Sequence, residues 1–311
     1  MSVLVVGDTN VDLEIRLPSD AHRETHANPD PQLFGGGSAA NTAAALARLD
    51  VPCRFAGAVG DDSFGRFAVE SLTEAGVDTA PVTVAPEEPT VTVIAVVQPD
   101  GDRLIYVWPP SGGAHGALQS SDAVDAVVGS TWLHVSGICL RLQPARDAVL
   151  AAMQRARADG IPVSFDLNLR LENWGWEGGF REVVVAAIGH ADVVLGAASD
   201  EISALAGIDD PVEAARTLAG ADRLVIARLG AAGAVACSAN GVTTVPGFEV
   251  AVVDTVGAGD AFDAGFIAAR LRGEDVAGAV RSGNAVAGLT VSRPGARSSP
   301  TRSEVEKLLG R

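Results

Sequence analysis

The chain has 311 residues, of which 47% are hydrophobic, so it can form one large α/β domain or a domain with a small appendage. Its formal net charge of −16 argues against nucleic-acid backbones and anionic membranes as partners. No apolar run is long enough to span a membrane. Cys53, Cys139 and Cys237 lie among apolar residues without metal-ligand spacing, which predicts reduced core cysteines in a cytoplasmic protein.

Short apolar runs recur along the chain and predict buried strands. These runs are 3–6, 54–59, 132–135, 163–166, 193–195, 224–227 and 234–237. Amphipathic stretches between them predict helices over 38–49, 64–75, 144–158, 180–191, 201–206 and 212–219. Continuous apolar strands that alternate with helices predict a mainly parallel sheet covered on both faces, which is a three-layer, Rossmann-like α/β fold.

Two segments break this alternation. Residues 12–17 alternate in polarity, and 90–97 with 103–108 predict a hairpin around the turn 99–102. No helix follows these strands, so we expect a small β-sheet that forms a lid from about 11–34 and 90–110. The whole chain, 1–311, is then a single domain that carries a lid.

The segment 254–266 contains a turn of small residues that leads into an apolar helix. Gly257, Ala258 and Gly259 leave backbone N–H groups uncovered, and the start of the helix adds more N–H groups and a positive dipole end. Such a site attracts phosphate. Asp260 would repel that phosphate, unless it takes a proton from a hydroxyl that attacks the phosphate. Taken alone, the turn equally fits a capped helix whose glycines allow close packing.

A second glycine-rich segment runs from Gly35 through Gly37 into the predicted helix that contains Asn41. The glycines let the backbone approach a ligand, and the Asn41 amide can both donate to and accept from a hydroxyl. The spacing of Gly35, Gly37 and Ala40 also fits a loose dinucleotide fingerprint, but that motif should directly follow the first strand. Asn10 and Asp12 do lie just past the first strand, where Asp12 is either a turn residue or a ligand of two sugar hydroxyls.

These motifs together resemble, in order and over nearly the whole chain, the ribokinase-like (PfkB) family of carbohydrate kinases. The matching segments are Gly7-Asp8-Thr9-Asn10-Val11-Asp12, Gly36-Gly37 with Asn41, Gly60-Asp61-Asp62, Asp166-x-Asn168-x-Arg170, Gly230-x-x-Gly233 and Asp254-Thr255-x-Gly257-Ala258-Gly259-Asp260. The last segment is the most specific to the family. In its pocket segments the chain is most similar to ketodeoxygluconate kinases and fructokinases.

The resemblance implies ATP-dependent phosphorylation of the primary hydroxyl of a ketose, pentose or sugar acid. Asp260 would be the general base, and Gly257, Ala258 and Gly259 would form the anion hole with it. The implied sugar ligands are Asn10, Asp12, Gly36, Gly37, Asn41, Trp108 and Arg170. Arg170 could receive a carboxylate or ketose oxygen, and Trp108 either stacks on the substrate or packs the lid.

The resemblance also implies where ATP and its cations bind. Arg228, Gly230, Gly233 and Asn284 would contact ATP. Mg²⁺ would arrive with ATP and be held through water by Glu201, although Ala198 stands where relatives have Asn. Asp254 and Thr255 match a loop that often holds a monovalent cation such as K⁺. Relatives also dimerise through exposed lid strands, so a homodimer is a further expectation.

Two alternatives share the same scaffold. A nucleoside kinase is favoured if Trp108 stacks on a base, and a non-catalytic sugar or nucleotide sensor is favoured by the Ala198 departure. An intact Asp260 opposes the sensor. An NAD-dependent oxidoreductase ranks last, because the glycine motif is misplaced for that function.

Overall fold

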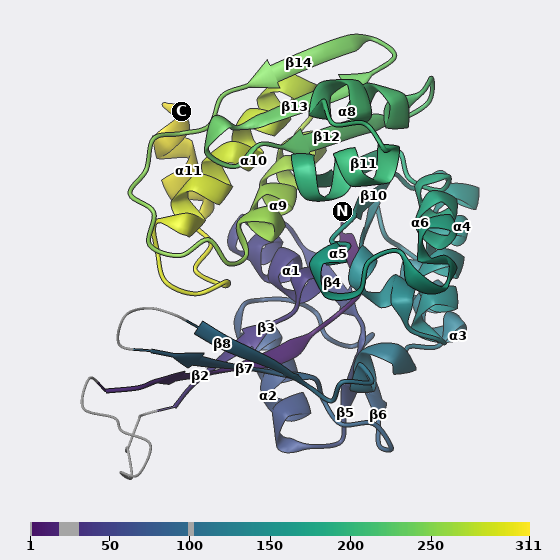
Figure 1. The fold of residues 1–311 in the computed structure, drawn as a ribbon, viewed down its shortest axis with the longest axis vertical. Coiled ribbons are helices and arrows are strands. Elements are labelled where there is room, and N and C mark those ends of the chain that lie inside the picture. Colours follow the sequence, from purple (N-terminus) through teal and green to yellow (C-terminus); the bar gives the residue numbers. More distant parts are fainter. Residues whose placement is uncertain (1, 19–30, 99–102) are drawn as a thin grey trace.

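The computed structural model describes residues 2–18, 31–98 and 103–311 (Figure 1). Part of the predicted lid, 19–30, and the predicted turn at 99–102 lie outside the described residues. Figure 1 shows a central sheet flanked by helices, with a separate smaller sheet below it. This arrangement is the expected three-layer α/β fold with a separate lid sheet.

The central sheet has eight strands in the order β14-β13-β12-β11-β10-β9-β1-β4. Their bounds are β1 (Val3–Val6), β4 (Cys53–Ala56), β9 (Trp132–Ser136), β10 (Val163–Asp166), β11 (Val193–Ala197), β12 (Leu224–Arg228), β13 (Ala234–Ser238) and β14 (Gly241–Val245). The strands from β4 to β12 are parallel, and β13 and β14 add an antiparallel edge. The prediction of a mainly parallel sheet is therefore confirmed.

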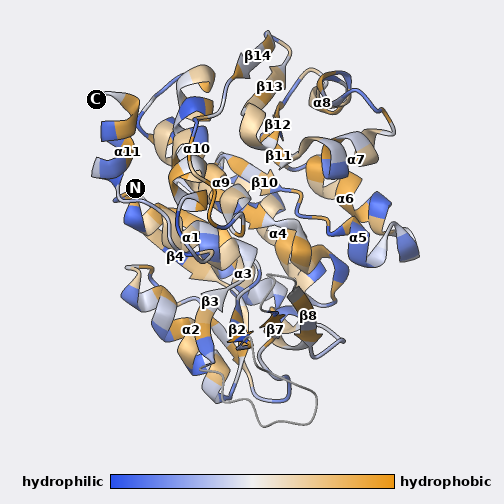
Figure 2. Cartoon of the chain, turned by 60° about the vertical axis from the view of Figure 1, so that its left-hand side comes forward, coloured by the Kyte–Doolittle hydropathy of each residue, from blue (hydrophilic) through white to orange (hydrophobic). Residues whose placement is uncertain are grey.

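Helices cover both faces because alternate residues of each strand point to opposite sides. In β1, Val3 and Val5 enter one core, whereas Leu4 and Val6 enter the other. The first core is covered by α1 (Ser38–Arg48), α9 (Ala258–Leu271), α10 (Val276–Val291) and α11 (Arg302–Leu309). The second is covered by α3 (Ser120–Val127), α4 (Ala145–Ala158), α6 (Phe180–Ile188) and α8 (Pro211–Ala219). Figure 2 shows α9 as mostly hydrophobic, while the outer helix α11 carries hydrophilic residues.

The smaller sheet, called the lid sheet below, has the order β3-β2-β7-β8. Its strands are β2 (Asn10–Arg16), β3 (Gln32–Gly36), β7 (Thr92–Val97) and β8 (Arg103–Trp108). Val11 of β2 packs against Ala68 of α2 (Ser63–Glu74), which joins this sheet to the rest of the molecule. The glycine segment thus begins as a strand, because Gly35 and Gly36 pair with Val11 and Asn10.

Short elements complete the chain. They are β5 (Ala58–Gly60), β6 (Thr83–Ala85), α5 (Leu171–Trp174), α7 (Ala204–Ala206), the 3-10 helices η1 (Gly113–Ala117), η2 (Gly137–Arg141), η3 (Glu177–Gly179) and η5 (Gly230–Ala232), and the π-helix η4 (Ala198–Ser203). The expected strand 54–59 is in fact divided between β4 and β5. Among the helices that the structure describes, none is long and apolar enough to cross a membrane.

The carboxyl ends of the parallel strands place polar residues at one edge of the central sheet. Asp8 follows β1, Asp166 ends β10 and Arg228 ends β12. Open parallel sheets bind ligands at this edge. The lid sheet continues directly from β1, so its first residues, Asn10 and Asp12, lie close to the same edge.

Candidate active site

The turn predicted to bind an anion is the first turn of α9, which begins at Ala258 with Gly257 as its N-cap. Gly257 has φ 77°, and a Cβ added there would lie 2.6 Å from the carbonyl oxygen of Ala296, so glycine is required. Within the described residues, the N–H groups of Gly259 and Asp260 make no hydrogen bond. Two free donors at the positive end of a 14-residue helix can bind a phosphate group.

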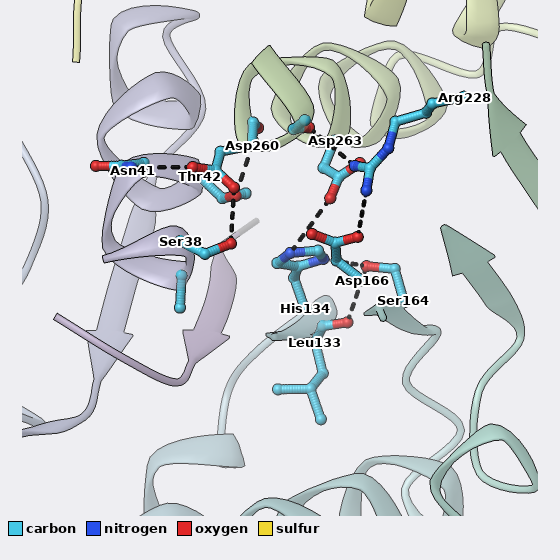
Figure 3. Close-up of polar contacts among 12 residues, drawn as sticks. Ser38, Asn41, Thr42, Leu133, His134, Ser164, Asp166, Arg228, Asp260 and Asp263 are labelled. Carbon is cyan, nitrogen blue, oxygen red and sulfur yellow. Dashed lines mark hydrogen bonds and ion pairs between the residues drawn. The ribbon is translucent and has the colours of Figure 1, made fainter. Parts of the chain in front are cut away.

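The carboxylate of Asp260 points from α9 toward α1 (Figure 3). Ser38 Oγ donates to Oδ1 at 2.7 Å, and Asn41 Nδ2 donates to Oδ2 at 2.9 Å. Thr42 Oγ1 also donates to the Asp260 carbonyl at 3.4 Å. These three contacts join α1 and α9 and set the direction of the carboxylate.

Asp260 is buried, and this burial raises the pKa of its carboxyl from 3.8 to about 6. The hydrogen bonds from Ser38 and Asn41 lower the pKa against that rise. A carboxylate with such a pKa is ionised near neutrality but accepts a proton more readily than an ordinary aspartate does. Its electrostatics therefore suit a general base.

The glycine segment brings the backbone of β3 against the residues that follow β1. Gly37 is the N-cap of α1 with φ 95°, and an added Cβ would lie 2.6 Å from the Cα of Thr9. Asp8 accepts from the N–H groups of Ser38 at 2.7 Å and Ala39 at 3.2 Å, which fixes the first turn of α1. Asp8 thereby places Ser38 where it can reach Asp260.

Asp12 lies beside this segment on β2. Asn10 Nδ2 donates to Asp12 Oδ1 at 2.6 Å, and a Cβ added to Gly36 would lie 2.6 Å from Asp12 Oδ2. Burial raises the pKa of Asp12 to about 6, whereas the Asn10 hydrogen bond and the charge of Arg297 lower it. A second carboxylate, which is half-buried, thus lies against the glycine segment.

Arg228, which the resemblance places at ATP, lies among the carboxylates of Asp166, Asp263 and Glu201, of which Figure 3 shows the first two. Its Nη2 donates to Asp166 Oδ1 at 2.6 Å, and its Nη1 donates to Asp263 Oδ1 at 2.8 Å. Nη1 also donates to the carbonyl of Gly259 at 3.2 Å, so Arg228 contacts the first turn of α9 directly. Its pKa is raised by Asp166, Asp263 and Glu201 in spite of its burial.

Asp263 lies one helical turn after Asp260 and is completely buried. Burial raises the pKa of Asp263, and Arg228 opposes that rise. Its Oδ2 has no hydrogen-bond partner among the described residues and lies 3.9 Å from Nε2 of His134. His134 is neutral, because burial lowers its pKa to about 3. Asp263 therefore depends on Arg228 for its charge compensation.

Glu201 is held by backbone groups. Its Oε1 accepts from Leu169 N and its Oε2 from Ala197 N, both at 2.7 Å. Burial and the nearby Asp166 raise its pKa. Across the described ranges, no group of three or more His, Cys, Asp or Glu side chains could hold a metal ion directly.

The other residues predicted to bind ATP or a cation lie in loops or make hydrogen bonds to loop backbone. Asn284 Nδ2 donates to the carbonyls of Val245 and Pro246, both at 3.1 Å, and holds the loop after β14. Asp254 accepts from Val256 N and Gly295 N, both at 3.1 Å, while the carbonyl of Thr255 accepts from Ala258 N. Gly230 opens η5, and Gly233 follows it with φ 97°.

The structure does not bring Trp108 to Asp12. Asp12 pairs with Val93, which pairs with Val107, whereas Trp108 pairs with Thr92, which pairs with Val11. Directly paired residues share a face and neighbours along a strand alternate, so Trp108 lies on the face opposite Asp12. Phe34, which pairs with Asp12, shares its face and is 44% exposed.

Arg170 lies in the loop that follows β10. Its backbone is left-handed, with φ 50°, and its side chain is exposed. No hydrogen bond or ion pair within the described part of the chain connects Arg170 to Asp12, Asn41 or Asp260.

A family model for pfkB family carbohydrate kinases matches residues 1–302. The chain belongs to the pfkB family of carbohydrate kinases. It is 33% identical over 317 residues to a fructokinase of Vibrio alginolyticus, with 99% of each chain covered. It is 36% identical to an ATP-dependent ribose-1-phosphate kinase of Halopiger xanaduensis, with 99% of this chain and 97% of the relative covered.

Solved structures agree with the pfkB assignment. A fructokinase from Vibrio cholerae O395, with bound fructose, ADP and calcium ion, superimposes with a TM-score of 0.81 at 32% identity, covering 99% of this chain and 98% of the other. Other solved relatives hold ATP with Mg²⁺, or fructose and ADP with a potassium ion. This pfkB chain is thus a sugar kinase of a family that uses ATP and a divalent metal.

Sequence reasoning missed four polar residues of this pfkB site: Ser38, Asp263, His134 and Arg297. Ser38 and Asp263 lie inside segments that the motifs above already include. Ser38 precedes Asn41 by one helical turn, and Asp263 follows Asp260 by one helical turn, so each could have been placed on the same helix face as its predicted neighbour. Arg297 stands in a loop of Gly, Ala and Ser residues far from every motif. Arg293 stands in the same loop, so nothing in the sequence singled out Arg297.

Proposed function

We propose that the chain, acting as one domain over 1–311, transfers the γ-phosphoryl group of ATP to the primary hydroxyl of a small sugar. The observation that carries this proposal is the position of Asp260. Its carboxylate is oriented by Ser38 and Asn41, and it belongs to the same helical turn as the free N–H groups of Gly259 and Asp260. One turn of α9 therefore combines a base for the acceptor with donors for the phosphate.

In the proposed reaction, the hydroxyl proton of the sugar passes to the carboxylate of Asp260. The sugar oxygen forms a bond to the γ-phosphorus as the bond to the bridging oxygen of the leaving ADP breaks. The backbone from Gly257 to Asp260 donates hydrogen bonds to the charge that develops on the phosphoryl oxygens. Ser38 and Asn41 hold the base in place during the transfer.

ATP is proposed to lie along Gly230 and Gly233 toward Asn284, and Arg228 would act on it only through Gly259. Bound Mg²⁺ would neutralise the phosphate charge. The donor set fits a water-mediated role for Glu201, since each of its oxygens already accepts one backbone N–H and retains a further lone pair. Asp254 and Thr255 remain our proposal for a monovalent cation such as K⁺.

For the acceptor, we infer a neutral sugar bound by Asn10, Asp12, Gly36, Gly37 and Asn41. Asp8, Asp12 and Asp260 make this region negative. Arg297 is the nearby cation, and each of its three nitrogens already donates to the protein. A sugar acid or sugar phosphate would have to meet this negative charge, unless Arg170 reached it. Phe34 is placed to cover the apolar face of the sugar.

The test is ADP release, measured with ATP and Mg²⁺ against fructose, ribose, a ketodeoxygluconate, ribose 1-phosphate and aminoimidazole riboside. We expect turnover with a neutral sugar, with the position of the new phosphate read by NMR. The Asp260→Asn variant serves as the negative control. Equal ADP release by this variant and by the unaltered chain with every acceptor would overturn the proposal.

A nucleoside acceptor is less favoured by the structure. The expectation of a nucleoside depended on Trp108 stacking on a base, and Trp108 lies on the lid-sheet face away from Asp12. A sensor without activity would have no need for a buried base with a raised pKa. Turnover of the riboside in the same panel, without turnover of free sugars, would select the nucleoside alternative.

The pH dependence of the reaction should report both pocket carboxylates. Asp12 and Asp260 have pKa values of about 6, and both must be ionised, one to accept sugar hydroxyls and the other to accept a proton. We expect kcat/KM to fall as the pH drops below about 6, with a limiting slope near two on logarithmic axes. In Asp12→Asn the residual activity should fall with a slope near one. A slope of one for the unaltered chain would contradict the two-group assignment.

We also propose that two copies associate through their lid sheets. The outer strand β8 has one unpaired edge in the order β3-β2-β7-β8, and its side chains from Leu104 to Trp108 are each at least 50% exposed. Monomers seldom leave such a long apolar strand uncovered. Pairing or stacking of β8 with its copy would bury it.

Light scattering after size exclusion will test this association. The unaltered chain should elute with twice the chain mass of 31.6 kDa, and Ile105→Lys should shift it toward the monomer by placing a charge in the interface. Val185→Lys is the matched control, since Val185 on α6 is 49% exposed but lies away from the lid sheet. A monomeric unaltered chain at all concentrations would exclude the homodimer.

A further inference from the structure

Arg297 lies in the segment between α10 and α11 and joins three elements of the N-terminal part of the chain. Its Nε donates to Asn41 Oδ1 at 3.1 Å, its Nη1 to Ser71 Oγ at 2.8 Å and its Nη2 to the carbonyl of Gly36 at 2.9 Å. It is also closely packed, since a Cβ on Gly35 would lie 2.0 Å from Nη1. The guanidinium therefore has little freedom to move.

This contact decides which way the amide of Asn41 faces. A guanidinium can only donate hydrogen bonds, so the atom of Asn41 that faces Arg297 must be the carbonyl oxygen. The amide nitrogen then faces Asp260, where it donates to Oδ2 at 2.9 Å. A flipped amide would direct its oxygen at the carboxylate and its N–H groups at the guanidinium. Both contacts would be repulsive.

We propose that Arg297 is a positioning residue that holds the Asn41 amide with its nitrogen toward Asp260. It acts on the base through Asn41 and needs no contact with the acceptor. The inference rests on the proposed function, in which Asp260 is the general base. It deepens that function by assigning a role to a residue 256 positions away from Asn41 in sequence.

The surroundings of Asp260 make its ionisation a sensitive measure of this role. Six groups act on the carboxylate. They are the donors Ser38 and Asn41 of α1 and the charged groups Asp8, Asp166, Asp263 and Arg297. The donors favour the ionised form, while the three carboxylates oppose it. Loss of the Asn41 hydrogen bond should therefore raise the pKa of Asp260.

The decisive experiment is a titration of the Asp260 carboxyl carbon by ¹³C NMR, with its signal identified by comparison with Asp260→Asn. We expect Arg297→Met to raise the titration midpoint by about one pH unit, as loss of a hydrogen bond to the ionised form does. With Asn41→Ala already present, Arg297→Met should raise the midpoint by much less, through the direct effect of the lost Arg297 charge alone. Ser71→Ala should leave the midpoint unchanged, because it removes an Arg297 contact that does not involve Asn41.

Two outcomes would overturn the proposal. An unchanged midpoint in Arg297→Met would mean that Arg297 does not orient Asn41. An equal rise in the presence of Asn41→Ala would mean that its charge acts directly on Asp260. If Arg297→Met does not fold, Arg297→Lys serves instead, since it keeps the charge but places a methylene where Arg has Nε. A raised Asp260 midpoint in Arg297→Lys would support the role of the hydrogen bond from Nε to Asn41. An unchanged midpoint in that variant would oppose it.

The titration needs no turnover, so its result is independent of whether the kinase assignment holds. Where activity is measured, the same variants add a second test. In the Asp12→Asn background, where Asp260 alone sets the acid limb of kcat/KM, Arg297→Met should move that limb upward by the same amount as the NMR midpoint, with KM for ATP unchanged. A loss of activity equal at every pH, with the limb unmoved, would indicate a merely structural role and would count against the proposal.

Discussion

Asp260→Asn is expected to lower kcat by about a thousandfold, the middle of the range for loss of a general base. Asn retains the shape of Asp260 and can still contact Ser38 and Asn41, but it cannot take up the hydroxyl proton. KM for ATP should change little, because the backbone donors at Gly259 and residue 260 remain. Steady-state ADP release at pH 8 gives both constants. A loss of less than about fivefold would exclude Asp260 as the base.

The stability of the same variant separates loss of function from loss of fold. The folded pKa of Asp260 is about 6, above its ordinary value of 3.8, so its contribution to stability is full below 3.8 and is lost as the pH rises through 6. At pH 8 the unaltered chain therefore carries a cost of up to about 3 kcal/mol that Asn avoids. We expect Asp260→Asn to unfold no earlier than the unaltered chain in urea at pH 8.

Arg228→Met should lower the free energy of unfolding by about 3–5 kcal/mol, the usual cost of removing one partner of a buried ion pair. Arg228 compensates Asp166, Asp263 and Glu201, and only 15% of its side chain is exposed. Its removal leaves three buried carboxylates without their shared cation. Urea unfolding followed by tryptophan fluorescence measures the change.

The matched control is Arg157→Met, because Arg157 and Asp192 form a pair that is roughly half exposed, at 3.9 Å. Such a surface pair contributes at most about 1 kcal/mol. A second variant, Arg228→Met with Asp263→Asn, should recover part of the loss, since it removes one uncompensated carboxylate. Equal losses for Arg228→Met and Arg157→Met would show that the buried network contributes no more than a surface pair does.

Local patterns were sufficient for most of the central sheet. The runs 3–6, 132–135 and 163–166 are buried on both faces, and their apolar residues are interrupted only by His134, Ser164 and Asp166, which makes parallel strands recognisable. The strand β3 was not recognisable, because Gly35 and Gly36 have low strand propensity and pair only where β2 provides a partner. The break between β4 and β5 at Gly57 also depends on tertiary packing.

The residues of the candidate site likewise divide into those that local sequence reveals and those that only tertiary contacts reveal. Asp12, Asn41 and Asp260 lie in motifs whose local chemistry is visible in a few consecutive residues. The face on which Trp108 lies depends on how β8 pairs with β7. The residues of β8 alone do not reveal this register, because the sequence does not show which residues of the partner strand lie opposite. Arg297 gains its role only from contacts made across more than 200 residues. Such contacts leave no periodic trace in the sequence.

The pairing of Ser38 with Asp260 has a consequence for biosynthesis. The two residues are 222 positions apart, so a ribosome that adds 5–20 residues per second leaves roughly 10–45 s between their synthesis. During that interval α1 has emerged but α9, which covers its apolar face, has not. The nascent chain thus exposes an alanine-rich helix face until α9, which lies in the last fifth of the chain, has been made. Premature termination before α9 would release a chain with an uncovered core, which is a substrate for chaperones and proteases.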